Sequence, residues 1–260
     1  MSTLKLHNHV SFEALPARLA RASASSHARA LALSTWLLKR KRDGRFLAAV
    51  DTRGQMQRLA PMRASEVLAL EKFAKQIQAA GRSTGHTLPL AGLEQRLRML
   101  GLSSEDYAHR TGLHLIAEPA TLDFAGWDRY QRPLWLTRDT ARAWHQMGVA
   151  ARRDDVHLEA VSGYRGHDYQ LRIFERKLGR GQPVEDILRV NAAPGYSEHH
   201  SGRALDISSL GEPAAEESFE RTDAFQWLST HAPTFGFRLS YPRNNPHGIV
   251  YEPWHWYYIG

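Results

Sequence analysis

The sequence has no cysteine among its 260 residues. Disulfide bonds, a thiolate nucleophile and thiolate metal ligands are therefore excluded. A zinc site in this chain would have to use histidine and carboxylate ligands, a ligand set that indicates a catalytic rather than a structural ion.

The sequence also lacks an apolar run long enough to span a bilayer. The best candidate, residues 28–38, is followed by the basic run 39–42. A secretory signal places its positive charges before the apolar segment and ends in a small-residue cleavage site. Because the order is reversed here, we expect neither a membrane span nor a Sec-type signal.

Acidic residues are scarce in the first half of the chain. Residues 1–133 contain 20 Lys and Arg against 11 Asp and Glu, whereas residues 134–260 contain 14 against 16. The net charge of +7 therefore arises in the N-terminal half. This excess predicts a polyanionic partner such as an anionic cell-wall polymer, and a solvated basic face is the alternative. The basic residues form no identifiable recognition motif, so we expect no specific nucleic acid.

The N-terminal region, residues 1–115, is predicted to be mostly helical and carries no recognisable chemical constellation. Apolar residues recur at helical spacing over residues 13–40, 64–80 and 93–100, while 45–51 resembles a short strand. We place a domain boundary near residue 115, where a mixed connector with a short strand at 113–116 is expected.

The remaining residues, 116–260, mix helices with strands. Thr137 is a plausible N-cap for a helix ending near Arg153, and Thr222 can cap another helix. Further helices are predicted at 166–177 and 184–190, and strands at 156–162, 203–207, 235–241 and 249–258. Helices followed by strands at the end predict an α+β fold with a mainly antiparallel sheet.

Three residues from two distant segments form a candidate metal site. His199 and Asp206 lie in the stretch PGYSEHHSGRALD, and His255 lies in EPWHW near the C-terminus. A catalytic zinc needs three protein ligands and an open fourth position for water, and His, carboxylate and His fit that requirement.

Glu252 is the candidate general base. A metal lowers the pKa of its bound water to about 7, and a carboxylate beside a ligand can take the proton and pass it to the leaving amine. Residues three apart on a regular strand face opposite sides, so Glu252 and His255 can share a site only if the backbone is irregular between them. The alternative is a solvated Glu252 beside core aromatic residues.

Three further residues are candidate substrate contacts. Arg165 follows the strand predicted at 156–162 and could clamp a carboxylate or stabilise an oxyanion, or instead pair with Asp168 at the surface. Gln170 could add hydrogen bonds. Ser197 could contact substrate or make a local turn.

These motifs resemble one known family. Four motifs occur in the order found in the zinc D-alanyl-D-alanine and L,D-carboxypeptidases of bacterial cell walls. They are SGYR with Gln five residues later, PGYSEH followed by GRALD, the WL…FGF…SYP run at 227–242, and EPWHWYYIG. This is the vancomycin-resistance type, whose fold is shared with the Hedgehog signalling domain. The resemblance covers about residues 134–260.

The resemblance implies a role for each candidate residue. His199, Asp206 and His255 would bind one zinc ion, Glu252 would be the catalytic base, Arg165 would act at the substrate, and Gln170 and Ser197 would line the cleft. Two positions depart from the pattern: His200 stands where relatives often have Gln, and Tyr257 where they often have Arg.

The expected activity is release of a terminal D-alanine, by D,D- or L,D-cleavage, from peptidoglycan stem peptides. Two alternatives are a lysin-like peptidoglycan endopeptidase and a non-catalytic, zinc-stabilised wall-binding module. The substrate indicates the cell envelope or periplasm. The absence of a Sec-type signal leaves export by another route, or a cytoplasmic role in wall recycling, as alternatives.

Overall fold

The computed structural model describes residues 4–21, 25–79 and 86–260. The chain divides into two compact units, which are described separately: Met1–Pro89 with Pro119–Asp123, and Leu90–Glu118 with Phe124–Gly260. No helix within the described ranges is both long and apolar enough to cross a membrane.

The first unit is an antiparallel sheet with helices. Its strands follow the order β5-β4-β3-β2-β1, and the first residues of β6 pair with β1. Its elements are β1 (Lys5–Asn8), β2 (Phe12–Pro16), η1 (Ala17–Leu19), α1 (Ser25–Ala32), β3 (Ser34–Arg40), β4 (Phe46–Asp51), β5 (Met56–Arg58) and α2 (Ala64–Ala79). The apolar stripe of α2, which includes Leu70 and Phe73, packs with Leu38 and Leu47 of the sheet to form this unit's core.

The predictions for this region were only partly right. Strand β4 and helix α2 lie where they were expected, except that Ala80 falls outside the described residues. The prediction of helices over residues 13–40 is wrong for β2 and β3, whose residues pair with each other from Phe12↔Arg40 to Pro16↔Trp36. A mostly helical description of the N-terminal region therefore missed its antiparallel sheet.

The second unit carries the predicted α+β architecture. Its elements are α3 (Leu93–Met99), α4 (Ser104–Thr111), the end of β6 (Thr121–Trp127), β7 (Pro133–Leu136), α5 (Arg138–Arg153), β8 (Glu159–Ser162), α6 (His167–Leu178), α7 (Val184–Arg189), η2 (Glu198–Ser201), β9 (Ala204–Ser208), η3 (Glu217–Arg221), α8 (Asp223–His231), η4 (Ala232–Phe235), β10 (Phe237–Leu239) and β11 (His255–Tyr258). Helix α5 starts directly after Thr137, as predicted, although the Thr137 side chain makes no capping hydrogen bond. The second predicted cap is confirmed, because the Thr222 hydroxyl accepts a hydrogen bond from the Phe225 N–H at 3.2 Å.

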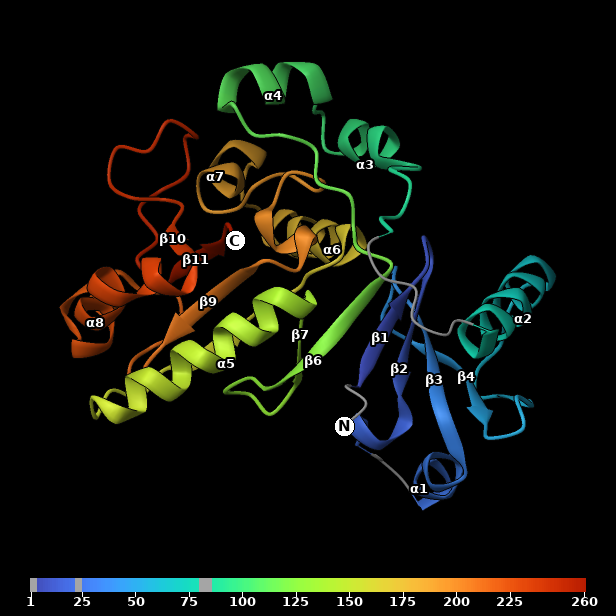
Figure 1. Cartoon of the computed structure of the whole chain (residues 1–260). Helices are drawn as coiled ribbons and strands as arrows, with labels where there is room; N and C mark the ends of the chain where they lie inside the picture. The colour runs from blue at the N-terminus through green and yellow to red at the C-terminus, as the bar shows by residue number, and fades with distance from the viewer. Residues whose placement is uncertain (1–3, 22–24, 80–85) are drawn as a thin grey trace. The chain divides into compact units, whose positions relative to one another are not determined.

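A four-stranded antiparallel sheet in the order β10-β11-β9-β8 is the centre of this unit. Helices α5 and α8 cover it, as Figure 1 shows. Met147 of α5 and Leu228 of α8 pack with Leu205 and Trp256 of the sheet in one buried cluster. This packing fixes the central strands, β9 and β11, on which two of the predicted ligands lie.

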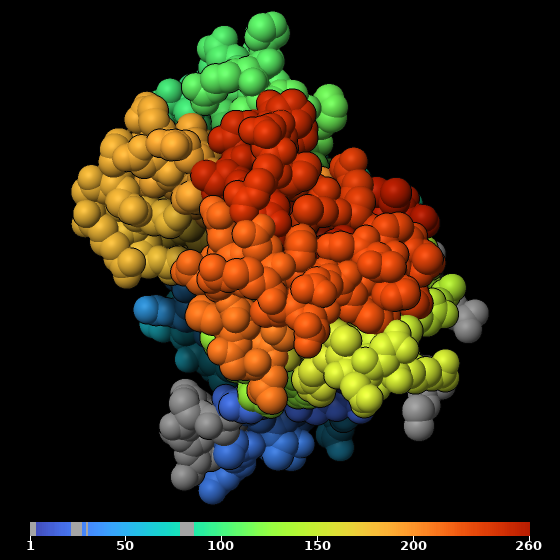
Figure 2. All heavy atoms as spheres, turned by 90° about the vertical axis from the view of Figure 1, so that its left-hand side faces the viewer, coloured from blue at the N-terminus to red at the C-terminus, as the bar shows by residue number. Residues whose placement is uncertain are grey.

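A second cluster holds the loop before His199. Tyr107 and Leu93, from α4 and α3, pack with Tyr196, Tyr241 and other buried residues. Figure 2 shows α4 in green, the α6–α7 region in gold and the segment before β11 in red gathered on one face. Helices α3 and α4 precede the boundary predicted near residue 115, yet they belong to the compact unit that holds the candidate site.

Two strand predictions in this unit fail. Residues 113–116 form no strand, and the strand predicted over 249–258 shortens to β11. The segment before β11 is a turn in which the His255 N–H donates to the Glu252 carbonyl at 3.1 Å.

Candidate active site

Strand register brings two of the predicted ligands together. Asp206 on β9 and His255 on β11 are directly paired in the antiparallel ladder. Side chains directly opposite each other in such a ladder lie on the same face of the sheet. The carboxylate Oδ1 of Asp206 is 3.1 Å from Nδ1 of His255 as a result.

His199 reaches the same point from the short helix η2. The left-handed Gly202 (φ 68°) ends η2 and turns the chain into β9. The Nδ1–H of His199 donates to the Gly163 carbonyl at 2.7 Å, which leaves Nε2 facing Asp206 Oδ1 at 3.2 Å. The His199 carbonyl accepts from the Arg165 N–H at 3.2 Å, so the segment after β8 holds both the ring and the backbone.

The three side chains fit a divalent metal ion. One donor atom from each of His199, Asp206 and His255 lies within 4.8 Å of the other two, and all three residues are buried. In a tetrahedral site with bonds of about 2.0–2.1 Å, ligand atoms are roughly 3.4 Å apart. The separations of 3.1 and 3.2 Å to Asp206 are therefore close to those of a ligand set.

The protonation state of His199 suits it to bind a metal ion. Burial, with the nearby Arg165 charge, lowers the pKa of His199 to about 4. A neutral His199 whose proton is on Nδ1 presents at Nε2 a lone pair that a metal cation can bind. The donor set thus fits zinc.

Glu198 is a site residue that the sequence analysis did not assign. Its Oε2 accepts a hydrogen bond from His255 Nε2 at 2.9 Å, and its side chain is largely buried. A carboxylate that binds the distal nitrogen of a ligand histidine fixes the ring and makes the ligand nitrogen more basic. Its presence within the SEH triplet was the only available signal.

The two carboxylates shape the charge of His255. Burial lowers the pKa of His255, but hydrogen bonds to Asp206 and Glu198 outweigh this and raise it to about 10. Burial acts to raise the pKa of Asp206, and the two imidazoles overcome it and hold that pKa well below its usual range. The same negative surroundings that keep a proton on His255 would attract a metal cation to Nδ1.

Glu252 lies beside the ligands because the chain turns there. The turn between Glu252 and His255 replaces the expected strand, so residues three apart face the same site. Glu252 Oε2 is 3.9 Å from His255 Nδ1. Burial raises the pKa of Glu252 to about 7 in spite of the nearby His255, which is a favourable value for a general base at neutral pH.

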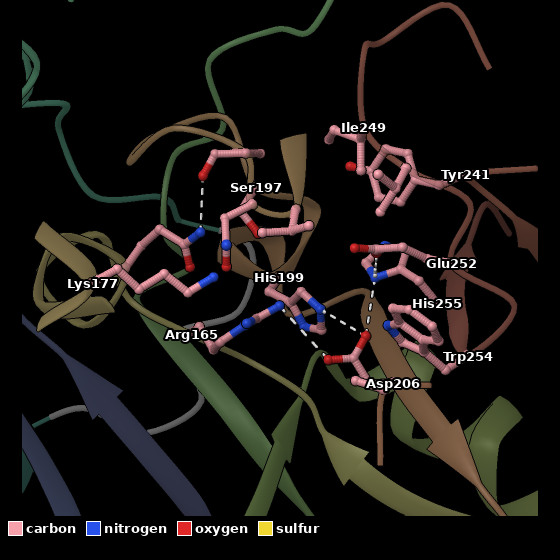
Figure 3. Close-up of a pocket in the computed structure, with 16 residues that line it drawn as sticks. Arg165, Lys177, Ser197, His199, Asp206, Tyr241, Ile249, Glu252, Trp254 and His255 are labelled. Atoms are coloured by element: carbon pink, nitrogen blue, oxygen red, sulfur yellow. Dashed lines mark hydrogen bonds and ion pairs between the residues drawn. The ribbon is translucent and has the colours of Figure 1, made fainter. Parts of the chain in front are cut away.

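A cavity of about 310 Å³ opens beside these residues. Arg165, Gln170 and Ser197, the three predicted substrate contacts, all line it. Arg165 lies 3.7 Å from Asp206 Oδ2, and Asp168 pairs with Arg96 at 2.8 Å, so the surface pair considered for Arg165 is not formed. Figure 3 shows Arg165 and Ser197 across the cavity from Glu252 and Tyr241.

The cavity has further walls that the sequence analysis did not assign. Lys177 of α6 and the aromatic residues Tyr241 and Trp254 line it. His200, one of the two departures from the family pattern, does not: it is fully buried behind the site, where Nδ1 donates to the Arg165 carbonyl at 2.6 Å and Nε2 accepts from the Gly195 N–H at 3.0 Å.

This arrangement agrees with the comparison of the chain with known families. Residues 133–260 match the family model described as VanY, D-alanyl-D-alanine carboxypeptidase. Residues 133–260 are a VanY-type domain. The candidate ligands and Glu252 all lie within the matched region.

The VanY-type domain is similar to parts of several named proteins. The Bacillus subtilis protein YodJ, named as a carboxypeptidase, is 36% identical over 132 residues, which cover 48% of this chain and 47% of that protein. A D-alanyl-D-alanine carboxypeptidase of Enterococcus faecium is 32% identical over 130 residues, 49% of this chain and 38% of that protein. The chain therefore spans less than half the length of these relatives.

A solved structure is also similar to part of the chain. It is a mutant of the vancomycin-resistance D,D-pentapeptidase VanY from a VanB-type cassette, in complex with Zn(II). It is 28% identical, with a TM-score of 0.42, and the match covers 48% of this chain and 74% of that one.

Proposed function

We propose that this protein is a zinc-dependent carboxypeptidase that releases a terminal D-alanine from peptidoglycan stem peptides. The observation that carries the proposal is the buried His199, Asp206 and His255 set with Glu252 at its edge, inside the region that matches the VanY family. The names of the relatives support D-alanine as the residue released.

One zinc ion per chain would be held by Nε2 of His199, Oδ1 of Asp206 and Nδ1 of His255. When bound, zinc polarises a carbonyl and lowers the pKa of water. Glu198 keeps His255 in the tautomer with a free Nδ1, and the Gly163 carbonyl keeps His199 in the tautomer with a free Nε2.

Glu252 moves the proton. Because its pKa is about 7, the carboxylate can take a proton from the attacking water and, as a carboxylic acid, deliver it to the leaving amine. Its side chain is 12% exposed, which limits its contact with bulk water. A positioned acid–base group of this kind contributes about 10²–10⁴-fold to a rate.

Arg165 supplies positive charge on the other wall. Its guanidinium lies 3.7 Å from Asp206 Oδ2, close enough to the ligand set to stabilise negative charge that develops on the scissile carbonyl oxygen. Gln170 and Ser197, both buried in the cavity wall, can hydrogen-bond the peptide.

The test is hydrolysis of defined pentapeptide and tetrapeptide stems, followed as free D-alanine. We expect release from one of them by the zinc-loaded protein, loss on chelation, and return on adding zinc. The Glu252→Gln variant should keep its zinc and lose at least about 10²-fold in kcat. Internal cleavage without free D-alanine would instead establish the endopeptidase alternative, and unchanged turnover of Glu252→Gln would refute the mechanism. Zinc and peptide binding with no hydrolysis would favour the wall-binding module.

We also propose that the N-terminal region binds an anionic wall polymer and that the protein acts in the cell envelope. Residues 1–133 contain 20 basic and 11 acidic residues, and this basic excess supports the polymer contact. The proposed stem-peptide substrate supports the location in the cell envelope. Such binding would weaken with salt because it depends on exposed charges. Co-sedimentation with isolated walls that does not respond to salt would argue against the polymer contact, and fractionation of cells would test the location.

A further inference from the structure

Lys177 is a second cation in the wall of the cavity. It lies near the end of α6 and is half-buried, and the cavity is lined by it together with Arg165 and Glu252. Figure 3 shows its side chain entering from the same side as Arg165, with Glu252 and Tyr241 opposite. Among the described residues, none of the ion pairs within 4 Å includes Lys177. Its ammonium therefore lines the cavity with no carboxylate of the described residues within 4 Å.

Burial acts on this ammonium. It lowers the pKa of Lys177, assisted by the Arg176 charge, while the Glu252 charge acts in the opposite direction. A partly desolvated cation gains from a bound anion because that anion replaces the hydration that was lost.

Two neighbouring polar atoms also lack partners. Gln170 Oε1 and Arg165 Nε are buried and make no hydrogen bond. Gln170 Nε2 donates to the Ala192 carbonyl at 2.8 Å, which fixes the orientation of the amide and leaves Oε1 able only to accept. Buried polar groups are normally paired, so these two atoms are available to pair with a polar group in the cavity.

The two cations of this wall have different positions. Arg165 is drawn toward Asp206 and thus toward the candidate zinc ligands. In the described part of the chain, no ion pair within 4 Å joins Lys177 to Asp206, so its ammonium lies farther from that carboxylate than the Arg165 guanidinium does, which is 3.7 Å from Oδ2. In a peptide, the terminal carboxylate carbon is three bonds beyond the scissile carbonyl carbon, roughly 3–4 Å away. A cation that binds the terminus must therefore be offset from the cation that acts at the scissile bond.

We propose that Lys177 is a specificity-determining residue that binds the C-terminal carboxylate of the peptide, so that the site selects chain ends over internal bonds. This inference rests on the proposed function and adds to it the reason for terminal cleavage. Arg165 serves the reacting carbonyl, and Lys177 serves the free terminus.

The test measures peptide binding, so that it does not depend on turnover. Zinc-loaded Glu252→Gln protein, which is expected to leave the peptide intact, is titrated calorimetrically with a stem pentapeptide as the free acid and as the C-terminal amide. The same titrations are made with Lys177→Met and Lys177→Arg added. Lys75→Met, an exposed lysine of α2, is the matched control.

We expect Lys177→Met to weaken binding of the free acid about 10–100-fold and to leave binding of the amide unchanged. Lys177→Arg should retain most of the affinity for the acid, and Lys75→Met all of it. In the otherwise unsubstituted enzyme, Lys177→Met should raise KM for the acid with little change in kcat.

Three results would overturn the inference: unchanged affinity for the acid, equal weakening for acid and amide, or no binding of either peptide. Lys177→Met could also weaken binding of the amide as much as of the acid, and this effect could disappear when an acidic residue inside the stem is replaced. Lys177 would then be assigned to a side-chain carboxylate of the peptide instead. Binding that depends on Lys177 in a protein whose unsubstituted form cleaves no stem peptide would refute the proposed function and leave this inference standing.

Discussion

Replacement of Glu198 should weaken zinc binding although Glu198 is not a candidate ligand. Its Oε2 lies 2.9 Å from His255 Nε2, and its side chain is 12% exposed, so the hydrogen bond is little screened by water. A hydrogen bond to a charged group contributes about 1.5–3 kcal/mol. If that energy is lost from the metal-bound state, zinc affinity falls about 10–100-fold, the range usual for carboxylates behind ligand histidines.

The assay is competition for zinc against a chromophoric chelator at fixed pH. Glu198→Ala should show the full loss, and Glu198→Gln a smaller one because an amide oxygen can still accept the hydrogen bond without the charge. Glu185→Ala, at an exposed position of α7, is the control and should bind zinc as the unsubstituted protein does. Equal zinc affinity in Glu198→Ala and the control would refute the argument that this carboxylate orients His255.

Three other outcomes are expected. In the metal-free protein, folding raises the pKa of Glu252 from 4.5 to about 7, so between these pH values the folded state keeps a proton that the unfolded state has lost. The free energy of unfolding should therefore fall by on the order of 3 kcal/mol as the pH increases from 4.5 to 7. Urea unfolding should show this pH dependence in the unsubstituted protein and not in Glu252→Gln. His200→Leu leaves the Gly195 N–H and the Arg165 carbonyl without their buried partner and should lower the free energy of unfolding by about 2–5 kcal/mol. His200→Gln can both donate and accept, so thermal unfolding should show that it recovers much of this stability. Equal losses of stability in the two variants would contradict the hydrogen-bond account. In Gly195→Ala the backbone has a φ of 94° and the added Cβ would lie 2.6 Å from a leucine of α3, so the protein should lose about 2 kcal/mol or more of stability. Gly211→Ala is the control and should lose clearly less, because its φ is similar but its added Cβ has no atom within 4 Å.

Local sequence signals predicted helices better than strands. Thr137 and the apolar stripe after it predicted the bounds that α5 has, Arg138–Arg153, although the Thr137 side chain makes no capping hydrogen bond. By contrast, the strands β2 and β3 lie in an Ala-, Leu- and Arg-rich stretch whose composition favours helix. They form because their residues pair with each other and are buried against α2, and neither cause is visible in a local window.

The candidate site was predicted by motif, and its geometry was not. Asp206 and His255 are 49 residues apart, and only the β9–β11 register shows that they are opposite each other. The geometric difficulty at Glu252 disappears because a turn takes the place of the expected strand. Glu198 and Lys177 were missed because each acts through a tertiary contact: Glu198 with a ring from β11, and Lys177 with the cavity.

The central claim is tested most directly by the zinc content of the purified protein and of its Asp206→Ala variant after dialysis against trace zinc. The account predicts close to one zinc ion per chain in the unsubstituted protein and a large loss in the variant, because Asp206 Oδ1 lies within 3.2 Å of a ring nitrogen of each ligand histidine. Zinc retained in full by Asp206→Ala, or absent from the unsubstituted protein, would contradict it.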